Sequence, residues 1–472
     1  MERTGTRRLS TGVAGLDEVL QGGLLSERVY HIRGGPGCGK TTLGLHFLAA
    51  DPQASAVHVT FGERPEQLRA DFSDLAGALQ AIEILDLSPA PSHLQSHPAY
   101  DLFHSDEVEV APVFERIQEA ASRLRPRRVF IDSLTQLRYL SPDPAQFRSQ
   151  VLALLRTFTD QGATVLFTSE ASGEAPDDDL RFLSDGVITL TLEADGSRSL
   201  EVSKLRGSGF LSGKHDLTLG DAQGIQVRPR LVPSHYGSRF EPQVINSGVP
   251  RIDQLIGGGV HRGTTTLLAG PSGSGKTTLG MQFMKEAAGR GESSALFLFE
   301  EDPATLLHRA DALQMPLRGM LERGTLYLER VEPLHYTPTQ LAHLLRHQVE
   351  ERDVRLVMLD SIAGYQLALR GQDPLLELHT LSQYLKNMGV TVLLVNEINA
   401  RSASELRSSS FDLSPLVDNV LLFNLVVEEG RLRKQLRMLK RRTGGFDERA
   451  AYLAFTPYGL EVEELGAGQQ AV

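Results

Sequence analysis

Short apolar runs alternate with helical stretches along this chain, and the runs come in two matching sets. They occupy residues 29–34, 57–63 and 127–133 in the first set and residues 265–270, 295–301 and 355–361 in the second. Apolar runs of this length, rich in β-branched residues and separated by helices, are typical of a parallel sheet covered on both faces. The pattern therefore predicts a doubly wound α/β domain, made twice.

The duplication extends well beyond these runs. GLDEVLQGGL at 15–24 matches RIDQLIGGGV at 251–260, and the two segments lie 236 residues apart (251 minus 15). Lys204 and Lys440 keep the same spacing. A match that spans whole domains is the signature of an internal repeat.

The length of the chain agrees with two domains. Single hydrophobic cores stop growing near roughly 250 to 300 residues, and this chain has 472. The segment 228–242 is rich in Pro, Arg and Gly and has no periodicity, which is typical of a linker. We predict a first domain at 1–235 and a second at 236–472.

Each copy contains the pattern G-x-x-x-x-G-K-[ST] directly after an apolar run. Such a loop wraps a phosphate with its backbone N–H groups, the next helix offers its positive end, and the lysine reaches the β and γ phosphates. The sequence therefore predicts two nucleotide sites. Their residues are Gly34, Gly37, Gly39, Lys40, Thr41 and Thr42 in the first copy, and Gly270, Gly273, Gly275, Lys276, Thr277 and Thr278 in the second.

A metal site is expected beside each loop. The threonine after the lysine, Thr41 or Thr277, is the usual Mg²⁺ ligand of such loops. Two of the apolar runs close on Asp132 and Asp360, which we expect to hold the metal through water. The alternative is that these aspartates only cap the turn after the strand.

Hydrolysis also needs a carboxylate that orients or deprotonates the attacking water. The second copy offers Glu300 and Glu301, whereas the first has Gly62 and Glu63. One hypothesis is that the first copy holds nucleotide and turns it over slowly. The alternative is that Glu63 suffices and Gly62 is a tolerated variation.

Composition narrows the class of protein. A net charge of −11 disfavours a general nucleic-acid binder, and no apolar run approaches the ~18 residues that span a bilayer. The first 20 residues contain no apolar segment of a signal peptide, and a single cysteine, Cys38, cannot form an internal disulfide. We therefore expect a cytoplasmic protein. Cys38 lies inside the first loop, where a redox switch is conceivable and a small residue that simply fits is the alternative.

The motifs resemble the KaiC family, the two-domain RecA-like ATPases and autokinases of circadian clocks. The resemblance covers nearly the whole chain. Its specific signals are FEED at 299–302, RFLSDGVITL at 181–190 with its counterpart LVDNVLLFN at 416–424, and the endings KLRG at 204–207 and KRRT at 440–443. It implies two tandem RecA-like P-loop NTPase domains with ATP and Mg²⁺ as ligands.

The resemblance also implies an assembly. Members of the family form homohexamers with ATP between neighbouring subunits, and act with regulatory protein partners that this sequence does not identify. Their K-x-R residues reach the neighbour's γ-phosphate, which assigns that role here to Lys204, Arg206, Lys440 and Arg442. The alternative is that these residues are solvated cations at strand ends.

A phosphorylation site is a further implication. The family phosphorylates an adjacent Ser–Thr pair in the second domain. LSPLVD at 413–418 matches that segment, keeps the serine as Ser414 and replaces the threonine by Pro415. Ser409 lies where the family has a further threonine. Half of the pair is missing, so a complete phosphorylation cycle is not expected.

Three functions compete at this point. The first is a hexameric ATPase with serine autophosphorylation in the second domain. The second is a RecA-type DNA-dependent ATPase, which the acidic segment 170–186 disfavours and Arg401 and Arg407 favour slightly. The third is a signalling scaffold that uses ATP to assemble a ring and turns over little of it.

Overall fold

The computed structural model describes residues 7–72, 75–88, 106–140, 143–170, 177–220, 224–332, 336–368, 373–398, 413, 415–428, 430–457 and 459–463. Contacts divide the chain into two compact units, Met1–Arg230 and Leu231–Val472. This division lies five residues before the expected one (235 minus 230), because Leu231 packs into the core of the second unit. No helix in the described part of the chain is long and apolar enough to cross a membrane.

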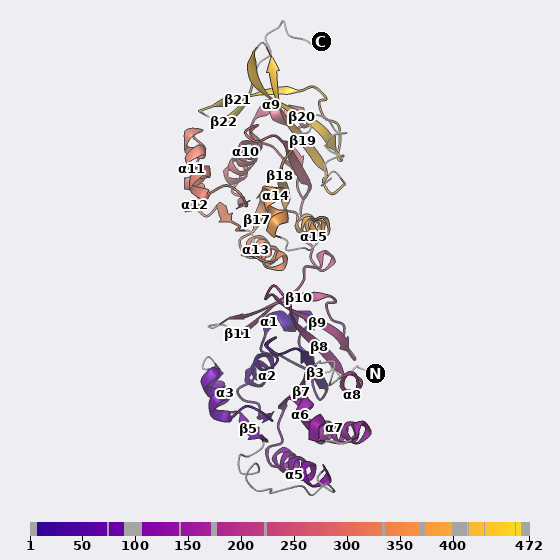
Figure 1. Ribbon diagram of the computed structural model, residues 1–472. Coiled ribbons are helices and arrows are strands. Elements are labelled where there is room, and N and C mark those ends of the chain that lie inside the picture. Colours follow the sequence, from indigo (N-terminus) through magenta and orange to yellow (C-terminus); the bar gives the residue numbers. More distant parts are fainter. Residues whose placement is uncertain are drawn as a thin grey trace. The chain divides into compact units, whose positions relative to one another are not determined.

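The first unit alternates strands and helices and then ends in a run of strands (Figure 1). In chain order its elements are β1 (Arg8–Leu9), α1 (Ala14–Val19), β2 (Leu24–Leu25), β3 (Val29–Gly34), α2 (Lys40–Ala49), β4 (Ala56–Thr60), α3 (Pro65–Asp71), α4 (Ala76–Leu79), β5 (Glu83–Asp86), α5 (Asp106–Leu124), β6 (Arg128–Asp132), α6 (Leu134–Leu140), α7 (Pro144–Thr159), β7 (Thr164–Ser169), α8 (Asp178–Leu183), β8 (Gly186–Leu192), β9 (Arg198–Leu205), β10 (Lys214–Gly220) and β11 (Gly224–Arg228).

The second unit repeats this order after a short 3₁₀ helix, Pro233–His235. Its elements are β12 (Val244–Ile245), α9 (Pro250–Leu255), β13 (Val260–His261), β14 (Thr265–Gly270), α10 (Lys276–Gly289), β15 (Ser293–Leu298), α11 (Pro303–Ala312), α12 (Leu317–Glu322), β16 (Leu326–Arg330), α13 (Pro338–Glu351), β17 (Val354–Asp360), α14 (Ile362–Ala368), α15 (Pro374–Asn387), β18 (Thr391–Glu397), β19 (Asn419–Glu428), β20 (Arg431–Arg441), β21 (Ala451–Thr456) and β22 (Gly459–Val462).

Each unit is built on a nine-stranded sheet of the same topology. The order is β11-β10-β9-β8-β3-β7-β6-β4-β5 in the first unit and β22-β21-β20-β19-β14-β18-β17-β15-β16 in the second. The six strands from β8 to β5, and from β19 to β16, pair in parallel, and the last three strands of each chain segment add an antiparallel extension. The predicted α/β fold of two mainly parallel, doubly wound domains is confirmed.

Successive side chains along the parallel strands point to opposite faces of the sheet, and both faces are buried. In the second unit, Leu268, Leu296 and Met358 belong to a core cluster that includes the apolar face of α10. The residues next to them in sequence, such as Leu267 and Phe297, belong to a second cluster with α13 and α15. This explains why the strands read as continuous apolar runs, and it holds the carboxyl ends of the strands at one edge, where ligands of such sheets bind.

Candidate nucleotide site

The phosphate loop of the second unit connects β14 to α10. Gly275 immediately precedes α10 with a φ of +110°, and a Cβ there would come within 3.0 Å of the Phe455 ring. Only glycine adopts this geometry without strain. Lys276 folds back over the loop, and its Nζ donates to the carbonyl oxygens of Gly270 at 2.8 Å and Pro271 at 2.7 Å. The loop and its lysine thus form one cradle.

The predicted metal pair of the second unit is in direct contact. The Thr277 hydroxyl donates to Asp360 Oδ2 at 2.7 Å, so the first turn of α10 meets the carboxyl end of β17. Among the residues that the structure describes, no group of three His, Cys, Asp or Glu side chains could hold a metal alone. Mg²⁺ in nucleotide sites commonly uses one or two protein oxygens, waters and substrate phosphates. The oxygens of Thr277 and Asp360 fit that requirement.

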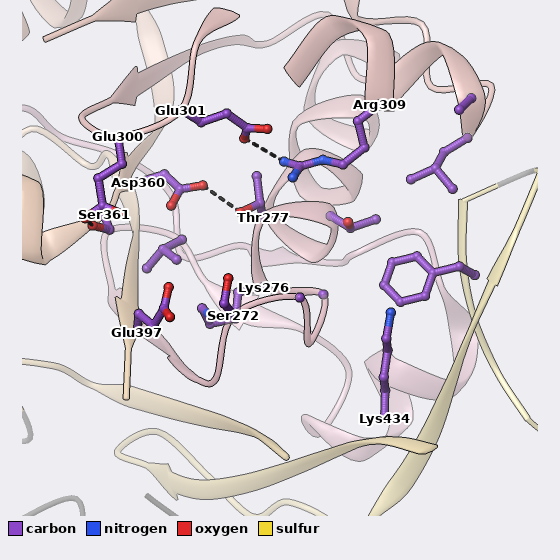
Figure 2. A pocket seen from close by; sticks show the side chains of 17 residues that line it. Ser272, Lys276, Thr277, Glu300, Glu301, Arg309, Asp360, Ser361, Glu397 and Lys434 are labelled. Carbon is purple, nitrogen blue, oxygen red and sulfur yellow. Dashed lines mark hydrogen bonds and ion pairs between the residues drawn. The ribbon is translucent and has the colours of Figure 1, made fainter. Parts of the chain in front are cut away.

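The two adjacent glutamates after β15 point to different partners. Glu300 Oε1 accepts a hydrogen bond from the Ser361 hydroxyl at 2.5 Å. Glu301 Oε2 accepts from Arg309 of α11 at 2.8 Å. Figure 2 shows Glu300 beside Ser361 and Glu301 beside Arg309, with Asp360 between the two pairs. The strand ends at Leu298 rather than at Glu301 as expected, which leaves both carboxylates on the loop before α11.

These groups surround a pocket of about 570 Å³. At one side the pocket is lined by the loop, the carboxylates and Glu397. Its lining also includes apolar side chains, among them Leu313 and Phe455. The Lys434 ammonium lies 3.6 Å from the centre of the Phe455 ring, so β20 and β21 form this wall. A pocket lined by a cationic loop, with an aromatic ring beside that loop, offers contacts to both the phosphates and the base of a nucleotide.

Burial sets the electrostatics of this pocket. It raises the pKa of Asp360, whereas the hydrogen bond from Thr277 opposes that change. Burial also lowers the pKa of Lys276, and the carboxylates of Glu397, Asp360 and Glu300 oppose it. A divalent cation would favour the ionised form of Asp360, because an opposite charge stabilises a carboxylate.

The first unit repeats the loop and the metal pair. Lys40 Nζ donates to the carbonyl oxygens of Gly34 and Gly35, each at 2.8 Å. The Thr41 hydroxyl donates to Asp132 Oδ2 at 2.6 Å. Asp132 Oδ1 also accepts from Thr168, a hydroxyl that the second unit lacks because Val395 stands there in β18.

The carboxylates are where the two units differ. Gly62 occupies the position of Glu300, and a Cβ there would meet no atom within 4 Å. Glu63 follows a turn in which Thr60 Oγ1 accepts its backbone N–H at 3.1 Å. Burial raises the pKa of Glu63, and the like charges of Asp132 and Asp71 raise it further. The first unit therefore has one carboxylate where the second has two, and that carboxylate is harder to ionise.

Cys38 does not have the environment of a reactive thiol. Its side chain is buried, and its Sγ donates to the carbonyl oxygen of Gly35 at 2.9 Å. Burial raises the pKa of the Cys38 thiol, the opposite of what a redox switch needs. Ser274 makes the same contact in the second unit, where its hydroxyl donates to Pro271 O at 2.7 Å. The geometry favours a small residue that fits the loop.

The K-x-R residues of each unit lie at the end of the sheet opposite to its phosphate loop. Lys204 Nζ donates to the backbone carbonyls of Arg181 and Ser184, and Arg206 N–H donates to the carbonyl of Asp185, which is bonded in turn to Val29. Val29 begins β3, whereas the loop follows the end of β3 about 16 Å further along, at about 3.3 Å per residue. These cations therefore lie about one strand length from the nucleotide site of their own unit.

The second unit has the same arrangement. Lys440 Nζ donates to Val417 O at 2.7 Å, and the Arg442 guanidinium donates to Asp418 Oδ1 at 3.1 Å. Asp418 is bonded to Thr265, the first residue of β14. The predicted phosphoserines Ser414 and Ser409 lie outside the described residues.

Several residues that line or support the second pocket were not predicted from the sequence. They are Ser361, Arg309, Glu397, Leu313, Lys434 and Phe455. Ser361 follows the predicted site residue Asp360 directly, and this position in the sequence is a signal that could have identified it. The others come from segments that only the fold brings to the loop.

Comparison with known proteins decides the family. A sequence model of the family described as "ATPase: KaiC" matches residues 9–232 and again residues 245–467. The chain belongs to the KaiC family of ATPases. The resemblance inferred from the motifs is thereby confirmed, and each unit is covered by its own KaiC match.

Several curated relatives named KaiC or KaiC2 align with this chain over most of their length. The circadian clock oscillator protein KaiC of Prochlorococcus marinus is 27% identical, with 97% of this chain and 93% of that protein aligned. The KaiC of Synechococcus elongatus is 26% identical, with 98% and 90% aligned. The circadian clock protein KaiC2 of Synechocystis is 26% identical, with 97% and 82% aligned. This chain is therefore similar to proteins named KaiC or KaiC2 over 97% or more of its length.

Proposed function

We propose that this chain hydrolyses ATP with Mg²⁺, mainly in the second unit, and assembles into a homohexameric ring with nucleotide between subunits. The observation that carries the proposal is the second pocket, in which the loop lysine, the Thr277–Asp360 pair and Glu300 line one cavity of about 570 Å³. The family match supports ATPase activity in general.

In the second unit, Lys276 and the loop amides bind the phosphates. Thr277 and Asp360 would hold Mg²⁺, which neutralises charge that develops on the transferred phosphate. Glu300 accepts the proton of the attacking water, and Ser361 holds that carboxylate by donating to Oε1. Phe455, whose ring lies beside Gly275 of the loop, and Leu313 would contact the base.

The first unit is proposed to bind ATP and to hydrolyse it slowly. Its loop, Lys40 and the Thr41–Asp132 pair have the same contacts as in the second unit. It lacks the first carboxylate because of Gly62, and the pKa of Glu63 is raised. A site that binds without fast turnover suits a ring whose assembly depends on bound nucleotide.

The position of the K-x-R residues supports the ring. Lys204, Arg206, Lys440 and Arg442 lie at the opposite end of the sheet from the loop of their own unit. At that distance they do not contact the phosphates of their own unit, which is consistent with a role at the phosphate of a neighbouring subunit. A trans cation of this kind stabilises the charge of the transferred phosphate, and it makes turnover depend on assembly.

Phosphorylation of Ser414 is the remaining part of the proposal. Leu413 and Val417, which flank this position in the sequence, are both buried in a core cluster of the second unit. Phosphate at that position would add about −1.5 to −2 charges. Incubation with labelled ATP followed by peptide mass spectrometry tests it. An unmodified 399–418 peptide from a preparation that hydrolyses ATP would leave an ATPase without kinase activity.

The test of the main proposal is ATP turnover by the full chain and by the variants Lys40→Ala and Lys276→Ala. We expect most turnover to disappear with Lys276→Ala and little with Lys40→Ala. Turnover that rises severalfold with single-stranded DNA would instead favour a DNA-dependent ATPase. Light scattering with ATP and with ADP measures the assembly, and a monomer at saturating ATP would contradict the ring. A ring without turnover would favour the scaffold.

A further inference from the structure

Arg309 is a third cationic group at the second pocket, besides Lys276 and Lys434. It lies in the last turn of α11, and its guanidinium reaches back to Glu301 Oε2 at 2.8 Å. Figure 2 shows this pair above Thr277, on the side of Asp360 away from Glu300. The ion pair therefore sits within the group of carboxylates that would carry out the reaction.

The counterpart in the first unit has the opposite charge. Both α3 and α11 begin with a proline after the carboxylate loop, and the sixth residue after Pro65 is Asp71 whereas the sixth after Pro303 is Arg309. In the described part of the chain no ion pair joins Glu63 to α3, although Arg69 lies in the last turn of that helix, and Glu63 experiences the like charge of Asp71. At this position, as at Gly62 and Glu300, the second unit has a group that would support hydrolysis and the first unit does not.

The ion pair is not explained by stability alone. The Arg309 side chain is 41% exposed, and exposed pairs of this kind contribute little to folding. The Nε of Arg309 is buried without a hydrogen-bond partner, which is unfavourable for a structural contact. By contrast, Arg318 of α12 makes a similar exposed pair with Asp311 at 2.9 Å, and neither of these two residues lines the pocket.

The effect of Arg309 on its neighbours follows from Coulomb's law. Four carboxylates line the pocket, Glu300, Glu301, Asp360 and Glu397, and adjacent carboxylates repel one another. Without Arg309, Glu301 would be free to turn toward the Thr277–Asp360 pair and the metal it would hold. With Arg309, Glu301 is held on α11, and only Glu300 stays available to water.

We propose that Arg309 is a positioning residue of the second pocket, whose ion pair holds Glu301 on α11 and so leaves Glu300 as the single carboxylate that acts on the attacking water. This inference rests on the proposed ATP hydrolysis of the second unit. It assigns the two adjacent glutamates different tasks, and it adds a second reason why the first unit turns over slowly.

The experiment is a double-mutant cycle in the full chain. The activity of the second unit is the ATP turnover that Lys276→Ala removes. Arg309→Gln should lower the turnover of the second unit about tenfold to a hundredfold, because the misplacement of a group near the reacting atoms lowers a reaction rate by about that factor. The dissociation constant of a fluorescent ATP analogue should change less than threefold, which separates positioning from binding. Arg309→Lys, which keeps the charge, should recover part of the loss.

The decisive comparison uses Glu301→Gln. If Arg309 acts through Glu301, then Arg309→Gln should change turnover less than about twofold in a Glu301→Gln chain. Arg318→Gln is the matched control and should leave turnover unchanged. If the double variant lost activity by the product of the two single losses, or if Arg318→Gln caused a loss as large as that of Arg309→Gln, the positioning role of Arg309 would be overturned. The proposed ATP hydrolysis would not be affected by either result. An unaltered chain that turns over no ATP would overturn the proposed function and this inference with it.

Discussion

Ser361 donates its hydroxyl hydrogen to Glu300, and the residue that stands in the place of Glu300 in the first unit is Gly62. This carboxylate is one difference between two nucleotide sites that share their loop, their lysine and their threonine–aspartate pair. A comparison of the two units within one chain is therefore the most direct way to measure what that carboxylate does.

Removing the carboxylate charge should affect the units unequally. Glu300→Gln should lower turnover in the second unit about 10² to 10⁴ fold, because it removes the proton acceptor. Glu63→Gln should change total turnover much less, since the first unit already lacks its first carboxylate. Steady-state phosphate release measures both, and equal losses in the two variants would contradict the assigned roles.

Restoring the missing carboxylate should activate the first unit. Gly62→Glu is sterically permitted, because a Cβ at this position meets no atom within 4 Å and the backbone lies outside the left-handed region. In a Lys276→Ala chain, where only the first unit is active, we expect turnover to rise about tenfold or more. Gly62→Gln is the control of equal size and should not activate. An unchanged rate with Gly62→Glu would mean that another feature limits the first unit.

The aromatic wall should matter for binding rather than for chemistry. Phe455→Ala should weaken ATP binding to the second unit by about 1 to 3 kcal/mol, the usual range for stacking of a base on an aromatic ring. Leu432→Ala is a suitable control, since Leu432 lies on β20 like Lys434 but is 64% exposed and does not line the pocket. Titration of a fluorescent ATP analogue measures both. Unchanged affinity in Phe455→Ala would place the base elsewhere.

Acid should destabilise the first unit. His58 is buried on β4 against Phe130, and burial lowers its pKa to about 4; burial likewise lowers the pKa of His31 to about 3. The unfolded chain takes up these protons near pH 6.5, so stability falls as the pH drops from 6.5 toward 4, by about 1.4 kcal/mol per pH unit for each histidine.

The second unit suggests the variant that tests this. Leu296 stands on β15 where His58 stands on β4. His58→Leu should therefore reduce the loss of stability between pH 7 and pH 5 by about 2 kcal/mol, as measured by denaturant unfolding. His379→Leu, at an exposed position of α15, is the control. An unchanged pH dependence in His58→Leu would mean that His58 is not the titrating group.

The sequence was sufficient for the features that depend on local spacing. The loop glycines are required wherever a backbone wraps a phosphate, so their pattern predicted both cradles and the strand before each. Asp132 and Asp360 were identified because each closes an apolar strand. In a parallel sheet the ends of such strands meet at one edge, and both aspartates contact the loop threonine as expected from that rule.

Features that depend on long-range packing were not accessible. Phe455 reaches the loop only because β20 and β21 extend the sheet past β19, and nothing in the sequence around Phe455 indicates a nucleotide. The expected strands also ran too far at Glu63 and Glu301, since a turn held by Thr60 ends β4. The composition of the linker indicated that a domain boundary lies there. It did not indicate that Leu231 packs into the core of the second unit.

The position of Arg442 at the far end of the sheet predicts that two inactive variants can complement each other. In the proposed ring, a subunit with Lys276→Ala would lose phosphate binding but would still offer Arg442 to its neighbour, whereas a subunit with Arg442→Ala would keep its pocket and offer no arginine. Each variant alone should be inactive in the second unit. Mixed in one ring, they should complement each other wherever an intact pocket faces an intact arginine, so two inactive preparations should regain part of the normal rate when combined. If the mixture stays inactive, although mass measurement finds mixed rings, Arg442 does not act across the seam.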